Sequence, residues 1–454
     1  MDRLNQISAT FYDIRKDLEH ILIIAHSDAD GYASAALLQQ MATREGIEFS
    51  TKYYSRKGTW NAYLNEILPD FDKFDNFAVF FADLGSEVRE INRVFEENDD
   101  SAEVFILDHH EMGKFDPDKI RDTVHVLNPT LFGYDGLKEI AGSALVYMFT
   151  KKISLKNIKN AWMALIGISN DTLMNVADYR SFNRMVLEEA QSEEQIIIHD
   201  GLQVYGATHE KLKNALAHSL FPFIKEVSGN TKNSGDILDK LGIDKNLKVA
   251  ELSGSGEEID IIDNYFEEPL KGQFIEFTNK KSGLLKFAFE HGLAISILTY
   301  KYQSKSEKLI SSSSISGEIN IEYKKYINNL TKNLGLFVKT PKEYTTHAIF
   351  VDAGKRIPTN FWSDVASYAS VNSLYNPDKA LFLGGRDGNV MRYSVRCSED
   401  FPSLKSGKGI DELIIKLKKI CGGVGGGHKL AGGYKIAPNK FKIMKNGLDD
   451  LFPL

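Results

Sequence analysis

The chain has 454 residues, which is long for one hydrophobic core and predicts two or three domains. Hydrophobic residues make up 43% and charged residues 26% of it, as in a globular protein, and the net charge of -7 argues against a protein that coats long nucleic acid by bulk electrostatics. A small anionic substrate, held by metal ions and a few local cations, is compatible with this charge. Cys397 and Cys421 are too few for a disulfide framework or a thiolate zinc site. No apolar run approaches a membrane span and the N-terminus lacks the apolar region of a signal peptide, so we expect a cytoplasmic protein.

The first elements predict a strand that delivers acidic side chains to a turn. Residues 4–19 can form an amphipathic helix, and the apolar residues 21–25 predict a buried strand. The sequence HSDADG follows at residues 26–31, where Asp28 and Asp30 stand two apart on extended chain and can lean toward one site. Capping of the next helix is the alternative explanation for these aspartates. A second strand at 47–54 and a helix at 59–68 come next.

Two further predicted strands also end in acidic residues. The strand at 76–82 ends at Asp83, and the strand at 104–107 ends at Asp108, His109 and His110, with a helix at 87–98 between them. An apolar run that stops at ligand-type residues is typical of a buried parallel strand with a site at its carboxyl end. Adjacent histidines on extended chain point to opposite faces, so one can bind metal while the other faces substrate. With another strand at 124–128, this alternation predicts an α/β fold with a doubly wound, mostly parallel sheet.

The middle of the chain is less informative. Residues 140–150 and 158–169 predict buried helices, the second of which ends next to Asp171. An aspartate past a helix end is usually a solvated terminus, so Asp171 is a ligand candidate only in the company of the other acidic turns. Residues 180–198 and 205–216 predict helices, and residues 228–236 predict a loop. We expect a helical connector and an insertion of uncertain fold here.

The last hundred residues predict a second organised block. A strand leads into a turn at 347–354, a helix follows at 360–374, and strands at 380–385 and 389–397 predict a hairpin. A helix at 409–420 leads into a glycine-rich segment at 421–436, which contains Gly425, Gly426, Gly427 and His428. Glycines let backbone N–H groups approach an anion closely, as in phosphate-binding loops. The segment is neither a Walker A loop nor a dinucleotide-binding fingerprint, and a simple helix-to-strand connector is the alternative.

Six short sequences, HSDADG, ADLGS, LDHH, SNDT, SVR and GGVGGGHKLAGG, occur in this order and resemble the motifs of the DHH phosphoesterase superfamily. The resemblance is to the branch with a C-terminal GGGH motif, which includes RecJ-like nucleases, nanoRNases and cyclic-di-AMP phosphodiesterases. It covers about residues 20–175 and 345–437. It implies a DHH catalytic domain at 1–185, a connector and insertion at 186–345, and a smaller α/β DHH-associated substrate-binding domain at 346–454.

The resemblance also implies a two-metal site. Aspartate and histidine without cysteine suit divalent cations such as Mn²⁺, with Mg²⁺ as the other choice. By resemblance, Asp28 holds one ion, Asp30 the other and Asp83 bridges them, while a metal-bridging hydroxide acts as nucleophile. Asp108 is expected to orient a histidine ligand, with direct ligation left open, and His110 to face the phosphate. The expected metal ligands are His26, Asp28, Asp30, Asp83, Asp108, His109 and Asp171, and the expected catalytic residues are Asp83, Asp108 and His110.

The expected substrate is a phosphodiester. Ser394, Arg396, Gly425–Gly427 and His428 match the family's substrate-binding positions, and arginine can clamp a phosphate with its planar fork. We therefore expect a RecJ-like exonuclease or nanoRNase that acts on single-stranded DNA or RNA or on short oligonucleotides. The alternatives are a cyclic-dinucleotide or nucleoside bisphosphate phosphoesterase and an inactive replisome scaffold. No membrane partner is expected, and a homodimer is left open.

Overall fold

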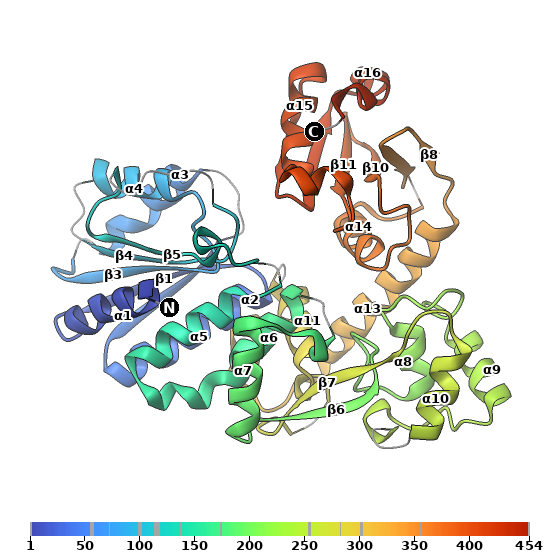
Figure 1. Cartoon of the computed structure of the whole chain (residues 1–454), viewed down its shortest axis with the longest axis horizontal. Helices are drawn as coiled ribbons and strands as arrows, with labels where there is room; N and C mark the ends of the chain where they lie inside the picture. The colour runs from blue at the N-terminus through green and yellow to red at the C-terminus, as the bar shows by residue number, and fades with distance from the viewer. Residues whose placement is uncertain are drawn as a thin grey trace. The chain divides into compact units, whose positions relative to one another are not determined.

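The chain divides into two compact units, which are described separately (Figure 1). The computed structural model describes residues 2–452 apart from 55–58, 72, 99–101, 113–118, 137, 173–174, 253–255, 282, 300–302 and 355. Unit 1 comprises Met1–Gln203, Leu252–Gly256 and Lys271–Tyr323, and unit 2 comprises Val204–Glu251, Glu257–Leu270 and Lys324–Leu454. The middle of the sequence thus contributes to both units, and the three-domain division stays a prediction. None of the described helices is long and apolar enough to cross a membrane.

A five-stranded sheet forms the centre of unit 1. Its strands are β1 (His20–His26), β2 (Glu48–Tyr54), β3 (Phe77–Ala82), β4 (Glu103–Leu107) and β5 (Val124–Leu127). They lie in the order β2-β1-β3-β4-β5 and every pair is parallel, so the predicted doubly wound sheet is confirmed. The chain reverses direction across the sheet between β1 and β3. At such a reversal a crevice opens outside the carboxyl ends of the strands, which is where ligands bind in this class of fold.

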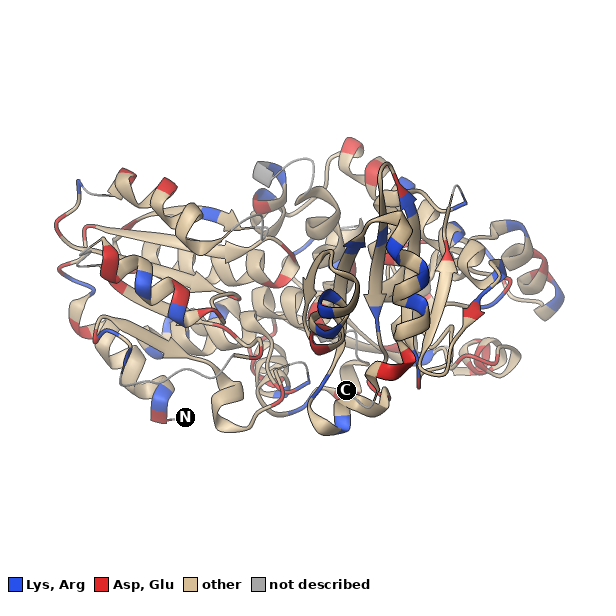
Figure 2. Cartoon of the chain, turned by 90° about the horizontal axis from the view of Figure 1, so that it is seen from above, with Lys and Arg blue, Asp and Glu red and all other residues tan. Residues whose placement is uncertain are grey.

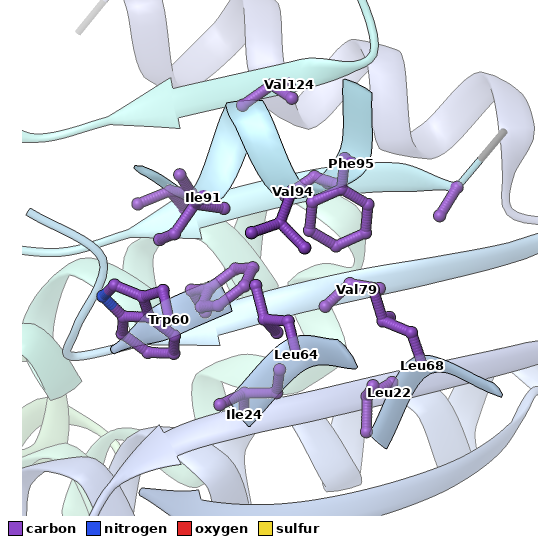
Figure 3. Close-up of a cluster of buried hydrophobic side chains, with 14 of the residues drawn as sticks. Leu22, Ile24, Trp60, Leu64, Leu68, Val79, Ile91, Val94, Phe95 and Val124 are labelled. Carbon is purple, nitrogen blue, oxygen red and sulfur yellow. The ribbon is translucent and has the colours of Figure 1, made fainter. Parts of the chain in front are cut away.

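Helices cover both faces of this sheet, as the apolar runs require. On one face, α3 (Trp60–Ile67) and α4 (Val88–Glu97) pack on side chains such as Leu22 and Val79 (Figure 3). On the other face lie α1 (Asp2–Ile14), α2 (Ala29–Glu45) and α5 (Gly142–Ile153) (Figure 1). There the ring of Phe11 in α1 meets Phe80 at 5.4 Å edge to face. Alternate residues of each strand thus serve opposite layers, which fixes the register of the sheet.

The rest of unit 1 corrects part of the sequence prediction. After α6 (Ala161–Thr172), helix α7 (Ser181–Ser192) is shorter than the predicted helix at 180–198. The three consecutive isoleucines at 196–198 instead begin β6 (Ile196–Leu202), because β-branched residues favour strands. Strand β6 pairs antiparallel with β7 (Lys271–Phe277), and α11 (Ala288–Thr299) and α12 (Gln303–Ser311) follow.

The helical part of unit 2 contains α8 (Leu212–His218), α9 (Thr231–Leu241) and most of α10 (Gly256–Tyr265). The long helix α13 (Gly317–Lys339) enters the unit at Lys324. Two predictions were wrong here. The helix predicted at 205–216 covers only 212–218, and the loop predicted at 228–236 contains the start of α9. The Asn230 side chain caps α9 by accepting a hydrogen bond from the Asn233 N–H at 3.1 Å.

A six-stranded mixed sheet forms the rest of unit 2. Its order is β12-β13-β11-β10-β9-β8, and only β9 and β10 are parallel neighbours. The predicted hairpin is confirmed as β10 and β11, whereas the predicted glycine-rich loop is the edge strand β12. The elements are β8 (Glu343–Tyr344), β9 (Ala348–Asp352), β10 (Ala380–Asp387), β11 (Val390–Arg396), β12 (Val424–Gly427), β13 (Ala431–Ile436), α14 (Trp362–Val371), α15 (Ile410–Cys421) and α16 (Phe441–Gly447).

Candidate metal centre and phosphate-binding face

The predicted acidic turns of unit 1 meet at the carboxyl ends of β1, β3 and β4. His26 is the last residue of β1, Asp83 follows β3, and Asp108 follows β4. Asp30 does not stand on extended chain as predicted but lies in the first turn of α2. Asp28 is the N-cap of that helix and accepts a hydrogen bond from the Gly31 N–H at 3.0 Å. Capping and the site are therefore not alternatives, because the cap holds the aspartate at the crevice.

Three overlapping groups of ligand-type atoms lie here, each within 4.8 Å. Asp83 and His109 are shared between groups, and the two atoms Asp83 Oδ1 and His109 Nε2 are 3.1 Å apart. His109 Nε2 is also 3.8 Å from Asp171 Oδ2, so the last turn of α6 joins the cluster from a distant part of the sequence. The groups are His26, Asp28, Asp83; Asp30, His109, Asp171; and Asp83, His109, His110.

The ring of His109 has a defined tautomer. Its Nδ1 lies 2.6 Å from the Gly136 carbonyl and 3.1 Å from the Ile140 carbonyl. Both partners can only accept, so Nδ1 carries a proton and donates it. In the neutral ring Nε2 then offers its lone pair to the cluster, which is the arrangement that metal-binding histidines use.

The backbone of α5 holds Asp30, which the sequence did not predict. The Gly142 N–H donates to Asp30 Oδ2 at 2.7 Å and the Ser143 N–H to Oδ1 at 3.0 Å. These amides belong to the first turn of α5, whose N-terminal partial positive charge favours a carboxylate. The small residues 141–143 were the signal that the sequence offered. Glycine is required at 142, because a Cβ there would lie 2.5 Å from Asp83 Oδ1.

Asp108 contacts His110 instead of joining the ligand groups. Its Oδ1 accepts hydrogen bonds from the His110 N–H at 3.1 Å and from Nδ1 at 2.7 Å. Among the described residues, Asp108 belongs to none of the three groups of ligand-type atoms. Asp108 is fully buried while His110 is about a quarter exposed, so the carboxylate fixes the direction in which the imidazole faces the crevice.

The cluster holds an excess of buried negative charge. Burial raises the pKa of Asp30 well above its ordinary value, and the nearby carboxylates of Asp83 and Asp171 raise it further. Burial likewise raises the pKa of Asp171. For His109, burial favours the neutral ring, but the surrounding carboxylates prevail and hold its pKa well above the ordinary value. Asp83 also adopts a left-handed backbone (φ 60°), a conformation that costs energy and recurs at functional sites.

Three of the predicted residues of unit 2, Ser394, Arg396 and Gly426, share one face of its sheet. Ser394 lies opposite Gly433, which in turn lies opposite Gly426, and directly opposed side chains project to the same side. Arg396, two residues after Ser394, projects from this face too. His428 is exposed in the turn between β12 and β13. Gly425–Gly427 thus do not form a loop, but as an edge strand β12 still has an unpaired side that can offer N–H groups.

Two serines that the sequence did not single out orient Arg396. Its Nε donates to Ser367 Oγ and its Nη2 to Ser363 Oγ, both at 3.0 Å. Nη1 donates to the Val395 carbonyl at 2.9 Å. The serines stand four apart on α14, so they form one stripe of the helix beside the guanidinium. In the sequence, only this four-residue spacing could have indicated that the two serines orient Arg396.

Part of the chain matches the model of a known protein family. Residues 20–199 match the model of the DHH family, N-terminal domain. A relative from Methanocaldococcus jannaschii, described as an uncharacterized protein, is 24% identical, with 99% of this chain and 98% of the relative covered.

Solved structures show the same fold at low identity. The CDC45 structure from Entamoeba histolytica has a TM-score of 0.69 at 13% identity, with 99% of both chains covered. The structure of RecJ in complex with Mn²⁺ from Thermus thermophilus has a TM-score of 0.56 at 14% identity, covering 99% of this chain and 54% of RecJ. The chain thus spans about half of that RecJ. Residues 20–199, whose motifs lie on a parallel α/β sheet, thus match the N-terminal domain of the DHH family.

Proposed function

We propose that this protein is a metal-dependent phosphodiesterase that hydrolyses single-stranded nucleic acid or short oligonucleotides with two divalent cations, Mn²⁺ or Mg²⁺. The observation that carries the proposal is the meeting of four chain segments at one crevice, where carboxylate and imidazole atoms form overlapping groups. Hard oxygen ligands with one or two imidazoles suit these cations.

The ligand atoms fit a pair of cations. Asp83 Oδ1, His109 Nε2 and Asp171 Oδ2 are buried without a hydrogen-bond partner among the described residues, although they lie close together. Buried polar atoms are rarely left unsatisfied, and here a cation would satisfy them. His26, Asp28 and Asp83 would hold one ion, and Asp30, His109 and Asp171, with Asp83 shared, the other. Two such ions polarise a phosphoryl group and lower the pKa of a water molecule.

His110 would donate a proton to the phosphoryl group of the substrate. Burial favours the neutral ring, but Asp108 outweighs burial and raises the pKa of His110 above its ordinary value. Because Nδ1 is bonded to Asp108, Nε2 is the ring nitrogen that would act on a substrate. A protonated His110 can donate from Nε2 to a phosphoryl oxygen or to the leaving oxygen. In unit 2, Ser394, Arg396, His428 and the edge amides of Gly425–Gly427 would bind the remainder of the nucleotide.

The relatives support this activity by analogy. The RecJ structures contain Mn²⁺ or Mg²⁺, and the fold of this chain is similar to theirs. The similarity to CDC45 concerns the fold alone, and the intact ligand groups favour an active enzyme over a scaffold.

A substrate panel with Mn²⁺ tests the proposal: dinucleotides, longer single-stranded DNA and RNA labelled at either end, and cyclic-di-AMP. We expect hydrolysis of linear single strands by the wild type and its loss in Asp83→Asn. Asp13→Asn, at an exposed position of α1, is the matched control and should keep full activity. Hydrolysis by Asp83→Asn at the wild-type rate would refute the two-metal site, and cleavage of cyclic-di-AMP alone would refute the substrate class.

A further inference from the structure

A basic groove lies in the helical part of unit 2. It is an open hollow of about 610 Å³ between α13, α8 and the start of α9. Acidic and basic residues are interspersed over the chain as a whole (Figure 2). No carboxylate, however, is among the described residues that line this hollow. Its basic and polar lining includes Lys324, Lys325, Lys332, His218, Asn230 and Thr231.

Two of the three lysines are available for a ligand. Lys325 and Lys332 are exposed and form no ion pair with any described residue. Lys324 lies 3.6 Å from Glu210 Oε1, a loose contact with a carboxylate that also accepts a 2.8 Å hydrogen bond from His218 Nδ1. One buried carboxylate thus orients the histidine and partly balances Lys324. The groove retains a net positive charge in a chain whose net charge is -7.

The spacing of the lysines indicates a ligand with more than one phosphate. Lys324 and Lys332 are eight residues apart on one helix, which corresponds to about 12 Å along the axis. Positive charge spread over this length matches a chain of phosphates better than a single phosphate. The N-terminus of α9, an 11-residue helix, adds partial positive charge through the end at Asn230 and Thr231.

From these observations we propose that the basic groove binds the phosphate backbone of single-stranded nucleic acid. The choice of this ligand rests on the proposed phosphodiesterase function. Lysine ammonium groups act as point charges and suit a flexible chain of phosphates, whereas planar carboxylates are recognised best by arginine, which is absent from the described lining. None of the described lining residues is aromatic either, so binding there is independent of base sequence.

The double variant Lys325→Gln/Lys332→Gln tests the groove. The matched control, Lys339→Gln/Lys440→Gln, removes two exposed lysines of the same unit that lie outside it. The measurement is fluorescence anisotropy of a labelled single strand of about 16 nucleotides, with EDTA present, over a salt series. Each lost phosphate contact makes the slope of log K against log salt shallower by about 0.7, so the groove variant should change it by about 1.4. If the groove variant and the wild type bind the strand equally at 1 M salt, this slope difference makes the variant bind about 25-fold more weakly than the wild type at 0.1 M salt.

Three results would overturn the groove: a salt slope in the groove variant equal to that of the wild type, an equal loss in the control variant, or complete displacement of the strand by poly-glutamate at equal charge. Retention of dinucleotide hydrolysis in the groove variant, together with weaker binding of the long strand, would support it. The failure of the catalytic proposal is separate. A wild type that binds the strand with the expected slope but hydrolyses nothing would refute the activity and leave the groove intact.

Discussion

The substitution Gly167→Ala tests whether the metal centre requires a residue without a side chain at position 167. Gly167 lies in α6, one turn before Asp171. A Cβ at this position would come within 2.0 Å of Asp30 Oδ1 and 2.3 Å of Ser143 Oγ. Neither neighbour can yield easily. Asp30 is fixed by two backbone amides of α5, and Ser143 Oγ donates to the Ala164 carbonyl at 2.9 Å.

Gly167→Ala should reduce metal affinity far more than it reduces the free energy of unfolding. Overpacking of this kind costs about 1–3 kcal/mol. Replacing glycine by alanine in a helix returns about 1 kcal/mol, so the net loss of folding free energy should be no more than about 2 kcal/mol. The protein stays folded, but Asp30 has to leave its position. Displacement of a group that positions or binds a metal costs about 10–100-fold in metal affinity or activity.

Isothermal titration with Mn²⁺, combined with urea unfolding of the metal-free protein, measures both effects. Gly335→Ala is the control, because Gly335 lies in α13 and a Cβ there would meet nothing within 4 Å. It should be neutral or stabilising by up to about 1 kcal/mol and bind Mn²⁺ like the wild type. If Gly167→Ala binds Mn²⁺ at both sites as tightly as the wild type does, Asp30 is not held as described.

Three further predictions follow from the same contacts. Asp108→Asn removes the charge that raises the pKa of His110, so the alkaline limb of the pH–rate profile should move to lower pH; an unmoved limb would exclude His110 as the acid. Mn²⁺ must displace protons from His109 and Asp30, whose pKa values are raised, so affinity should increase with pH by up to about tenfold per unit for each proton; titrations in two buffers should detect the released protons. Gly433→Ala should leave the thermal midpoint of the protein unchanged or raise it, because a Cβ there meets nothing, but it should raise KM for oligonucleotides; an unchanged KM would exclude this face from binding.

The sheet of unit 1 could be predicted because its signals are local and strong. Strands β1, β3 and β4 are apolar runs buried on both faces, and each stops at ligand-type residues. Parallel strands bring such ends to one edge, so the meeting of Asp28, Asp83 and His109 followed from the fold class alone. The motifs added Asp171, which no local pattern distinguishes from a solvated helix end.

The start of α9 could not be predicted, because tertiary packing overrides its composition. Serine, asparagine, glycine and threonine at 228–236 are typical of a turn. In the structure Asn230 caps the helix while Ser234 and Gly235 are buried, with α8 packed beside them. The burial of these residues appears only in the folded unit. The support of Asp30 was equally inaccessible, since its donors at Gly142 and Ser143 lie more than 100 residues away.

The glycine-rich hairpin shows how steric requirements separate structure from function within one motif. A Cβ at Gly432 would lie 2.5 Å from Ile414 Cδ1, and one at Gly427 would lie 2.2 Å from the Ala431 carbonyl, so packing explains these glycines. Gly426 and Gly433 face each other across the strands, and a Cβ at either would meet nothing within 4 Å. Glycine in a strand interior is destabilising by up to about 1 kcal/mol, so packing gives no reason to keep this pair. This loss of stability is explained if the backbone of a ligand must approach the sheet beside Ser394. A side chain at either glycine would then leave the fold intact but obstruct binding of the ligand.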